Sequence, residues 1–415
     1  MPRFYKLLCV VCVFYASSCR SGVDVYGPDL FTEGKSSAIS RVQIPSTHIL
    51  TDKLSLANNT GQKMDAEQRF DNSSTLCTVG FCMQMWNGTL QQMSQDGILN
   101  KGIKENWQNR SSLCIDTLKS SKKGDNAWYN HQEGSLNFTY RPSSPHHCMC
   151  RSFSTVSHET GHAFLHAVIP DLDSDSEYAN ALHEAVGDIT AIVASMRIGI
   201  LNGQFPQICR KLNKGGLEMR MPNHVCIRNA ADHVGYERFE CHDMSKPFTK
   251  CFFEMMKRSC EEKRVKDPAS FNSMLNTYRY CLLDSIFSSY SDSSNALLWN
   301  ILQRFGQSIR KFGLSAHLPI IEEYRQSLTE HIDLPNHAKI TIPVAINSFE
   351  SDHNFSSDAP HSASVSRENI GVPPGFQSMR ENAAIRRSID SQRTSTGQIR
   401  STYTTSNSTY GSWIR

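Results

Sequence analysis

Apolar side chains recur at the three- and four-residue spacing of amphipathic helices in several stretches of the chain. One such stretch covers residues 153–168 and is followed by Pro170, which cannot continue a helix. Two others cover residues 181–196 and 296–312. These patterns predict three helices within a region of high apolar density that runs from about residue 75 to residue 346.

The sequence on either side of this region is different. Residues 19–74 are polar and weakly periodic, which predicts an N-terminal segment with little structure of its own. Residues 347–415 are rich in Ser and Thr and contain few large apolar side chains. Such a composition cannot offset the entropy lost when a chain is ordered, so we expect a disordered C-terminal tail.

Residues 1–18 have the pattern of an export signal, because Arg3 and Lys6 precede a short apolar stretch that small residues follow. The stretch is too short to cross a bilayer, and no later run reaches the length that a transmembrane helix needs. We therefore expect a secreted protein with no transmembrane segment. A buried N-terminal strand is the structural alternative. In a bacterial chain, a lipid anchor through Cys19 is a second one, since residues 16–19 resemble a lipoprotein cleavage site.

Composition narrows the possible functions. The 415 residues carry 43 Lys and Arg against 40 Asp and Glu, with no basic stripe, which argues against nucleic-acid binding. Fourteen cysteines are many for a reduced cytosolic enzyme and predict disulfides in an oxidising compartment, with connectivity left open. Seven N-x-Ser/Thr sequons would carry glycans if the chain enters a eukaryotic secretory pathway; they begin at Asn58, Asn72, Asn87, Asn109, Asn137, Asn354 and Asn407.

The first predicted helix contains the sequence His158-Glu159-Thr160-Gly161-His162. Residues four apart lie on the same helix face, so the imidazoles of His158 and His162 can reach one tetrahedral metal ion. Glu159 lies beside that ion, where its carboxylate can take a proton from a bound water. An exposed helix face with charged pairing is the alternative interpretation of these residues.

The second predicted helix supplies a third candidate ligand, because Glu184 and Asp188 are also four residues apart. A carboxylate at Glu184 can complete a His, His, Glu set that leaves the fourth position to water. Asp188 can accept the remaining N–H of a ligating imidazole and so fix its tautomer. Taken alone, Glu184 would be read as a solvated carboxylate.

These motifs resemble those of the thermolysin-like zinc peptidases, in which a Glu on the next helix is the third ligand. Three further, weaker matches occur in the same order along the chain as in the family. Together with the zinc motifs they cover about a third of the chain. The stretch beginning Asn126-Ala127 resembles the edge segment that binds the peptide substrate. Arg228 resembles the residue that holds the substrate carbonyl, and His242 the one that stabilises the oxyanion. No Tyr aligns with the family's second oxyanion donor, since Tyr178 is out of register.

The resemblance implies an α+β fold with two lobes and one Zn²⁺ per chain. The N-terminal catalytic lobe would comprise residues 75–198, with the zinc helix, and a helical C-terminal lobe would comprise residues 199–346. The implied function is that of a secreted zinc endopeptidase that cleaves peptide or protein substrates, with Glu159 as general base. The alternatives are a catalytically silent zinc-binding protein that acts through a partner and, less favoured, a hydrolase of non-peptide bonds. Salt-bridging or core-edge roles remain open for Arg228 and His242, and a turn role for Asn126.

Calcium is a further candidate cofactor, because the run from Asp171 to Glu177 carries alternate acidic residues and related peptidases often use calcium for stability. The run lacks the central Gly and the final Glu of an EF-hand loop. We interpret it as a solvated acidic loop and keep Ca²⁺ as the alternative. His166, one turn beyond His162, is expected to be a surface or core histidine rather than a ligand.

Overall fold

A computed structural model provides the structure of the chain. Residues 1–21 and 332–415, which include the predicted export signal and tail, lie outside the part that it describes. Between residues 22 and 331 the description omits 29–40, 58–63, 120–125, 141–147, 173–175, 214–217, 221–225, 230–240, 262–264, 266 and 292–295.

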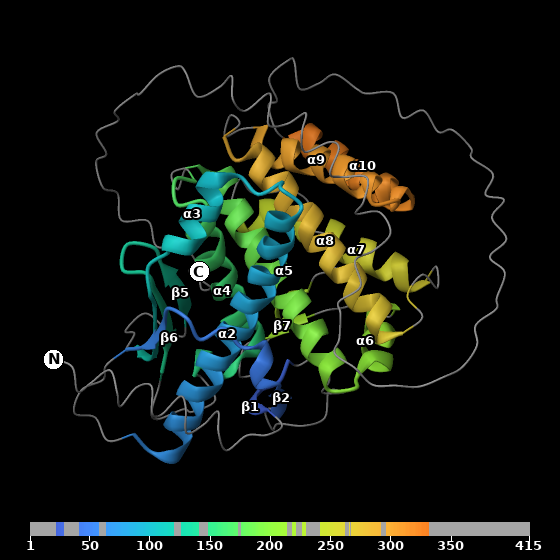
Figure 1. Cartoon of the computed structure of the whole chain (residues 1–415). Coiled ribbons are helices and arrows are strands. Elements are labelled where there is room, and N and C mark those ends of the chain that lie inside the picture. The colour runs from blue at the N-terminus through green and yellow to red at the C-terminus, as the bar shows by residue number, and fades with distance from the viewer. Residues whose placement is uncertain are drawn as a thin grey trace, which may run out of the picture.

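Two buried antiparallel helices, α4 (Phe153–Val168) and α5 (Glu177–Leu201), lie at the centre of the molecule (Figure 1). Both are buried on nearly every face, and apart from the candidate site most of their buried side chains are apolar or small and hydroxyl-bearing. Each begins at a serine whose side chain accepts a backbone N–H: Ser152 caps α4 and Ser176 caps α5. These caps fix where each helix begins and therefore which residues face the partner helix.

A mixed sheet covers one side of α4, with the strand order β3-β4-β6-β5. The strands are β3 (Leu54–Leu56), β4 (Leu113–Lys119), β5 (Ala127–Asn130) and β6 (Ser135–Thr139). β3, β4 and β6 run parallel, whereas β5 forms an antiparallel hairpin with β6. The hairpin turn contains Gly134 at a φ of 59°, a conformation that glycine adopts without strain. The sheet therefore places β5 at its edge, next to α4.

The remaining helices enclose the central pair. α2 (Ala66–Gln95) packs against α4, and α3 (Lys101–Asn109) packs against the same helix. Four helices lie on the side of α5 away from the sheet: α7 (Cys241–Glu261), α8 (Pro268–Ser289), α9 (Leu297–Lys311) and α10 (Leu318–His331) (Figure 1). Two short antiparallel strand pairs and one further helix are also present: β1 (Val23–Tyr26) with β2 (Arg41–Ile44), β7 (Glu218–Arg220) with β8 (Cys226–Asn229), and α6 (Phe205–Asn213). Three 3₁₀ helices cover Ser46–His48, Met149–Arg151 and Ser315–His317.

The described chain is thus mostly helical with a small mixed sheet, which agrees with the expected α+β class at that coarse level. Its buried apolar side chains form one continuous cluster from Val25 to Leu328. The domain limits proposed from sequence fall inside elements, since residue 75 lies within α2 and residue 198 within α5. None of the described helices has the length and apolarity that crossing a membrane requires.

The segment 19–74, expected to have little structure, contributes β1, β2, β3 and the start of α2. Its strands are too short to produce a clear periodic pattern, and they are buried by packing on helices, β1 on α2 and β2 on α5. Val25 and Ile44 are completely buried there. The expectation of a weakly structured segment therefore does not hold for the described part of it.

Two predicted glycosylation sequons have buried asparagines. Asn137 on β6 is 1% exposed, and its side-chain amide donates to the Ser135 hydroxyl at 2.9 Å. Asn72 on α2 is 9% exposed and accepts a hydrogen bond from Thr117. Asn109, the last residue of α3, is exposed. Of these three positions, only Asn109 has room for a glycan in the folded chain.

Candidate metal centre

His158 and His162 lie one turn apart on α4, and both side chains are completely buried. Their Nε2 atoms are 2.9 Å apart, and their rings meet edge to face. Two imidazole nitrogens this close can share one proton or one cation, but they cannot both be protonated without strong repulsion. The helix therefore brings two nitrogen donors to a single point inside the protein.

The close packing of α4 and α5 brings the third donor to that point. Gly161 faces Gly187 across the helix pair, and a Cβ at Gly161 would lie only 2.7 Å from the Gly187 Cα. A Cβ at Gly187 would lie 2.7 Å from Cε1 of His158. Glycine at both positions is therefore required for the backbones to approach, and this approach brings the short Glu184 side chain to the histidines.

Glu184, which is 3% exposed, has one carboxylate oxygen 3.5 Å from His158 Nε2 and the other 3.6 Å from His162 Nε2. The three donor atoms lie within 4.8 Å of one another. Ligand atoms at about 2.0–2.1 Å from a tetrahedral zinc ion are separated from each other by roughly 3.3 Å. The spacing and the two-imidazole, one-carboxylate chemistry of this group are therefore compatible with a single bound metal ion of this kind.

Asp188 contacts Nδ1, the second ring nitrogen of His158. Its Oδ1 lies 2.9 Å from His158 Nδ1, and its Oδ2 accepts a hydrogen bond of 3.3 Å from Thr249 Oγ1 on α7. Burial by itself would lower the pKa of His158, but the hydrogen bonds to Asp188 and Glu184 outweigh it and raise the pKa to about 9. A carboxylate that accepts from Nδ1 leaves Nε2 directed at the other donors, which is the tautomer that a metal ligand needs.

Two further residues of the expected machinery adjoin the three donors, Glu159 in sequence and His242 in space. Glu159 follows His158 on α4, and its side chain is completely buried. His242 is in the first turn of α7, is 20% exposed at its side chain, and has its Nε2 3.6 Å from Glu184 Oε1. Three helices therefore contribute to the site, and His242 is its most exposed member.

The predicted substrate-binding residues are placed only in part. Asn126 and Ala127 lie at the start of β5, the edge strand, where the Asn126 N–H donates to the Thr139 hydroxyl at 2.8 Å. Ala127 is completely buried. Arg228 lies on β8 opposite Met219 of β7, and its side chain lies outside the described residues. The middle of the acidic run that was considered for calcium, residues 173–175, also lies outside them.

Two buried residues near the centre were not singled out from sequence. Thr249 contacts Asp188 from α7, a relation between distant positions that no local pattern reveals. His183 is 2% exposed, and its ring centroid is 5.8 Å from that of His162. Burial, assisted by the charge of His166, lowers the pKa of His183 to about 3, so this ring is neutral. The only available signal for His183 was its position next to Glu184.

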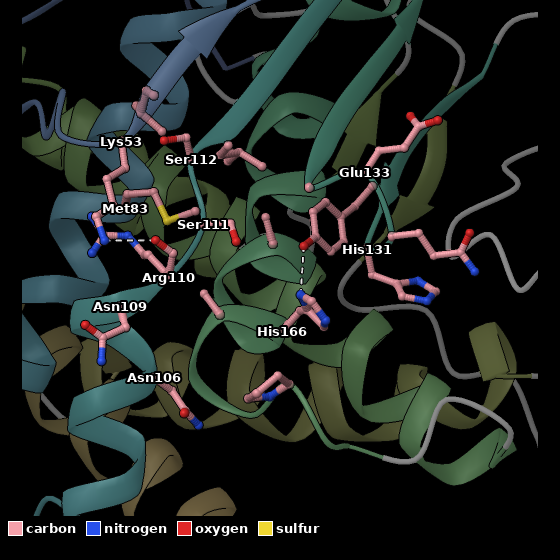
Figure 2. Close-up of a pocket in the computed structure, with 18 of the residues that line it drawn as sticks. Lys53, Met83, Asn106, Asn109, Arg110, Ser111, Ser112, His131, Glu133 and His166 are labelled. Atoms are coloured by element: carbon pink, nitrogen blue, oxygen red, sulfur yellow. Dashed lines mark hydrogen bonds between the residues drawn. The ribbon is translucent and has the colours of Figure 1, made fainter. Parts of the chain in front are cut away.

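A cavity of about 340 Å³ lies at the opposite end of α4 from Ser152 (Figure 2). His166 lies at the wall of this cavity (Figure 2), and its Nδ1 is 2.8 Å from the Tyr129 hydroxyl oxygen. The lining of the cavity includes Ala163 and His166 of α4 but none of the three candidate metal ligands. His166 thus has a local partner on β5.

Comparison with known proteins identifies no relative: no family model, no curated protein and no solved structure matches the chain.

Proposed function

We propose that the chain is a zinc-dependent endopeptidase whose metal ligands are His158, His162 and Glu184. The observation that carries this proposal is the convergence of these three buried donors from two helices, with the buried Glu159 directly following His158 on α4. A solvated helix face would have left these side chains exposed. A set of three protein ligands leaves one position open, as catalytic zinc sites do.

Zinc bound there would polarise a substrate carbonyl and lower the pKa of a water to about 7. Glu159 would take the proton from that water and deliver it to the departing amine. Asp188 would keep His158 in the tautomer that directs Nε2 at the ion, since it lies 2.9 Å from Nδ1. His242, at the exposed side of the group, would donate a hydrogen bond to the developing oxyanion.

The substrate would be a peptide or protein bound along β5. Edge strands carry backbone groups that an extended peptide can pair with, and β5 is an edge of the four-stranded sheet and contacts α4. Ala127 begins this strand, Asn126 directly precedes it, and Arg228 would hold the substrate carbonyl. Secretion through residues 1–18, with lipid anchoring at Cys19 as the bacterial alternative, remains part of the proposal.

Replacement of Glu159 by Gln tests the mechanism most directly. The variant retains the three ligands, so we expect unchanged zinc content but peptide hydrolysis lowered by about 10²–10⁴-fold, the usual contribution of a general base. Zinc is measured by elemental analysis and hydrolysis with a casein-type substrate. Glu105→Gln, an exposed carboxylate on α3 that pairs with Lys101, is the matched control and should retain full activity.

Three results would contradict the proposal in different ways. Unchanged hydrolysis by the Glu159→Gln variant would show that Glu159 is not the general base. A wild-type chain with one zinc ion and no turnover of any peptide in a library would favour the catalytically silent zinc-binding protein. A wild-type chain without zinc, or one that retains zinc after His158→Ala and Glu184→Ala, would exclude both functions.

A further inference from the structure

Two cysteines lie directly before the helix that carries the candidate metal ligands. Cys148 and Cys150 flank Met149 in a 3₁₀ turn (Met149–Arg151) that leads into the Ser152 cap of α4. Their sulfur atoms are 3.0 Å apart, and the two residues are 0% and 1% exposed. Two thiols at this distance have three possible uses: a hydrogen bond, a shared metal ion or a disulfide.

The metal-binding interpretation requires Asp71, the third group within 4.8 Å of these sulfurs. Both oxygens of Asp71 already accept hydrogen bonds from Arg151, from Nε at 3.0 Å and from Nη2 at 2.9 Å. The Tyr26 hydroxyl donates to the same carboxylate. Asp71 is therefore neutralised by a buried guanidinium, which would also repel a cation placed beside it. That leaves two sulfurs, too few protein ligands for a closed structural zinc site.

We propose that Cys148 and Cys150 form a disulfide with each other when the chain folds in an oxidising compartment. One thiolate attacks a sulfur of a small-molecule disulfide and releases one small thiol. The second thiolate then attacks the mixed disulfide, forms the Cys148–Cys150 bond and releases the second small thiol. Two protons leave the protein, and its two sulfurs are oxidised while the small disulfide is reduced to two thiols. This inference is independent of the proposed peptidase activity.

The burial of the pair determines when the bond forms. The pKa of the Cys150 thiol is raised well above its ordinary value, mainly by desolvation and next by the neighbouring Cys148. Thiolates are the reactive species in disulfide exchange, so the folded, reduced pair reacts slowly. The bond therefore forms before the turn is enclosed, and the same burial protects it from small thiols afterwards.

The position of the bond gives it a structural role. It would close the turn immediately before Arg151, whose guanidinium binds Asp71 on α2, and before Ser152, which caps α4. His158 follows one and a half turns later on that helix. A closed turn thus fixes the start of α4 relative to α2 and keeps the metal helix in register.

Peptide mass spectrometry of the full chain tests the inference. The denatured, reduced protein is refolded with oxidised and reduced glutathione, unfolded in acid, treated with iodoacetamide and digested with trypsin. Residues 124–151 form one tryptic peptide, because Pro142 protects Arg141, and its only cysteines are Cys148 and Cys150. We expect this peptide to be unalkylated and lighter by two hydrogen atoms than after reduction.

Cys281 provides an internal control in the same digest. It is completely buried on α8, like the pair, but it hydrogen-bonds to Ser308 rather than to a second thiol. The peptide that contains it should be fully alkylated. Alkylation of both Cys148 and Cys150, or a cross-link from either one to another peptide, would overturn the inference. A second metal ion per chain that Cys148→Ala removes would overturn it in favour of metal binding.

Discussion

His158 uses both nitrogens of its ring in the buried polar network. Nε2 faces His162 and Glu184, and Nδ1 faces Asp188, which in turn accepts from Thr249. A single imidazole thus connects α4 to α5 and, through Asp188, to α7. Its protonation state and orientation depend on carboxylates from one helix, and two predictions follow at the scale of this residue.

The first prediction concerns Asp188. Asp188→Asn keeps the size of the side chain but removes the negative charge that holds Nδ1 of His158. We expect the affinity for zinc to fall by about 10–100-fold, as replacements of such supporting carboxylates do. Competition with a chromophoric chelator measures this affinity. Asp116→Asn on β4 is the control, and an equal loss in both variants would show that Asp188 has no specific role.

The second prediction concerns pH in the zinc-free chain. The pKa of His158 is about 9 in the folded chain and about 6.5 in an unfolded one, so the folded state binds this proton more tightly. The resulting stabilisation, about 3 kcal/mol, is complete below pH 6.5 and is lost as the pH rises through 9. Urea denaturation of chelator-treated protein at the two pH values should show this loss. The Asp188→Asn variant should lose less stability over the same pH range. If it lost as much as the wild-type chain, the pH dependence would not come from the His158–Asp188 pair.

At this scale the sequence was informative wherever chemistry follows a fixed spacing. The i and i+4 positions of His158 with His162, and of Glu184 with Asp188, predicted a group that the structure brings together. Thr249 could not be predicted, because its contact with Asp188 depends on how α7 crosses α5. His242 was placed by resemblance to a family and lies beside Glu184.

At the scale of elements, the approach of α4 to α5 determines whether the donors can meet. The residues at their crossing are Gly161 and Gly187, whose missing side chains let the two backbones come close. The buried apolar residues of the same helices supply the hydrophobic burial that holds them together. The site therefore depends on two positions that carry no chemistry of their own.

Gly161→Ala tests this dependence. The new methyl group would meet the Gly187 Cα and the Val186 carbonyl oxygen, so the helices must separate, at a cost of about 1–3 kcal/mol in the free energy of unfolding. Zinc affinity should fall as well, because Glu184 moves away from the histidines. Gly88→Ala on α2 is the matched control: nothing lies within 4 Å of its Cβ, and the change should stabilise the protein by up to about 1 kcal/mol. Comparable destabilisation in both variants would contradict the packing argument.

The three helices predicted from apolar spacing are present, with limits shifted by only a few residues. α4 ends at Val168, close to Pro170, while α5 extends beyond the predicted 181–196 at both ends, and α9 nearly matches 296–312. Helices are recognisable because their pattern is local. The strands β1, β2 and β3 escaped prediction because they comprise only three or four residues and are stabilised by partners distant in sequence.

At the scale of the whole molecule, a buried ion pair joins helix α2 to the turn that leads into α4. Arg151 binds Asp71 inside the protein and Glu67 at its surface, where the carboxylate side chain is 56% exposed. The buried apolar core is continuous through the described parts of both lobes that the family resemblance implies. The division into two lobes stays a prediction of that resemblance, because composition and motifs do not reveal which helices share a core.

Asp71→Leu should destabilise the protein by about 3 kcal/mol, because it leaves the buried Arg151 without its innermost carboxylate. Glu67→Gln removes the other partner of the same guanidinium, but at a solvated position, and should cost at most about 1 kcal/mol. Chemical denaturation of the two variants measures the difference. Equal destabilisation by the two variants would show that the burial of the carboxylate does not determine the strength of its ion pair with Arg151.

The burial of Asn137 has a consequence for how the protein can be produced. A glycan is bulky and needs a surface position, whereas this asparagine lies inside the sheet on β6. If a eukaryotic secretory host glycosylated Asn137 on the nascent chain, those molecules could not bury this residue and form the native sheet. Expression in such a host would therefore divide the product into a folded fraction bare at Asn137 and a misfolded fraction that carries sugar there. A host without N-glycosylation avoids this loss, provided that its folding compartment is oxidising.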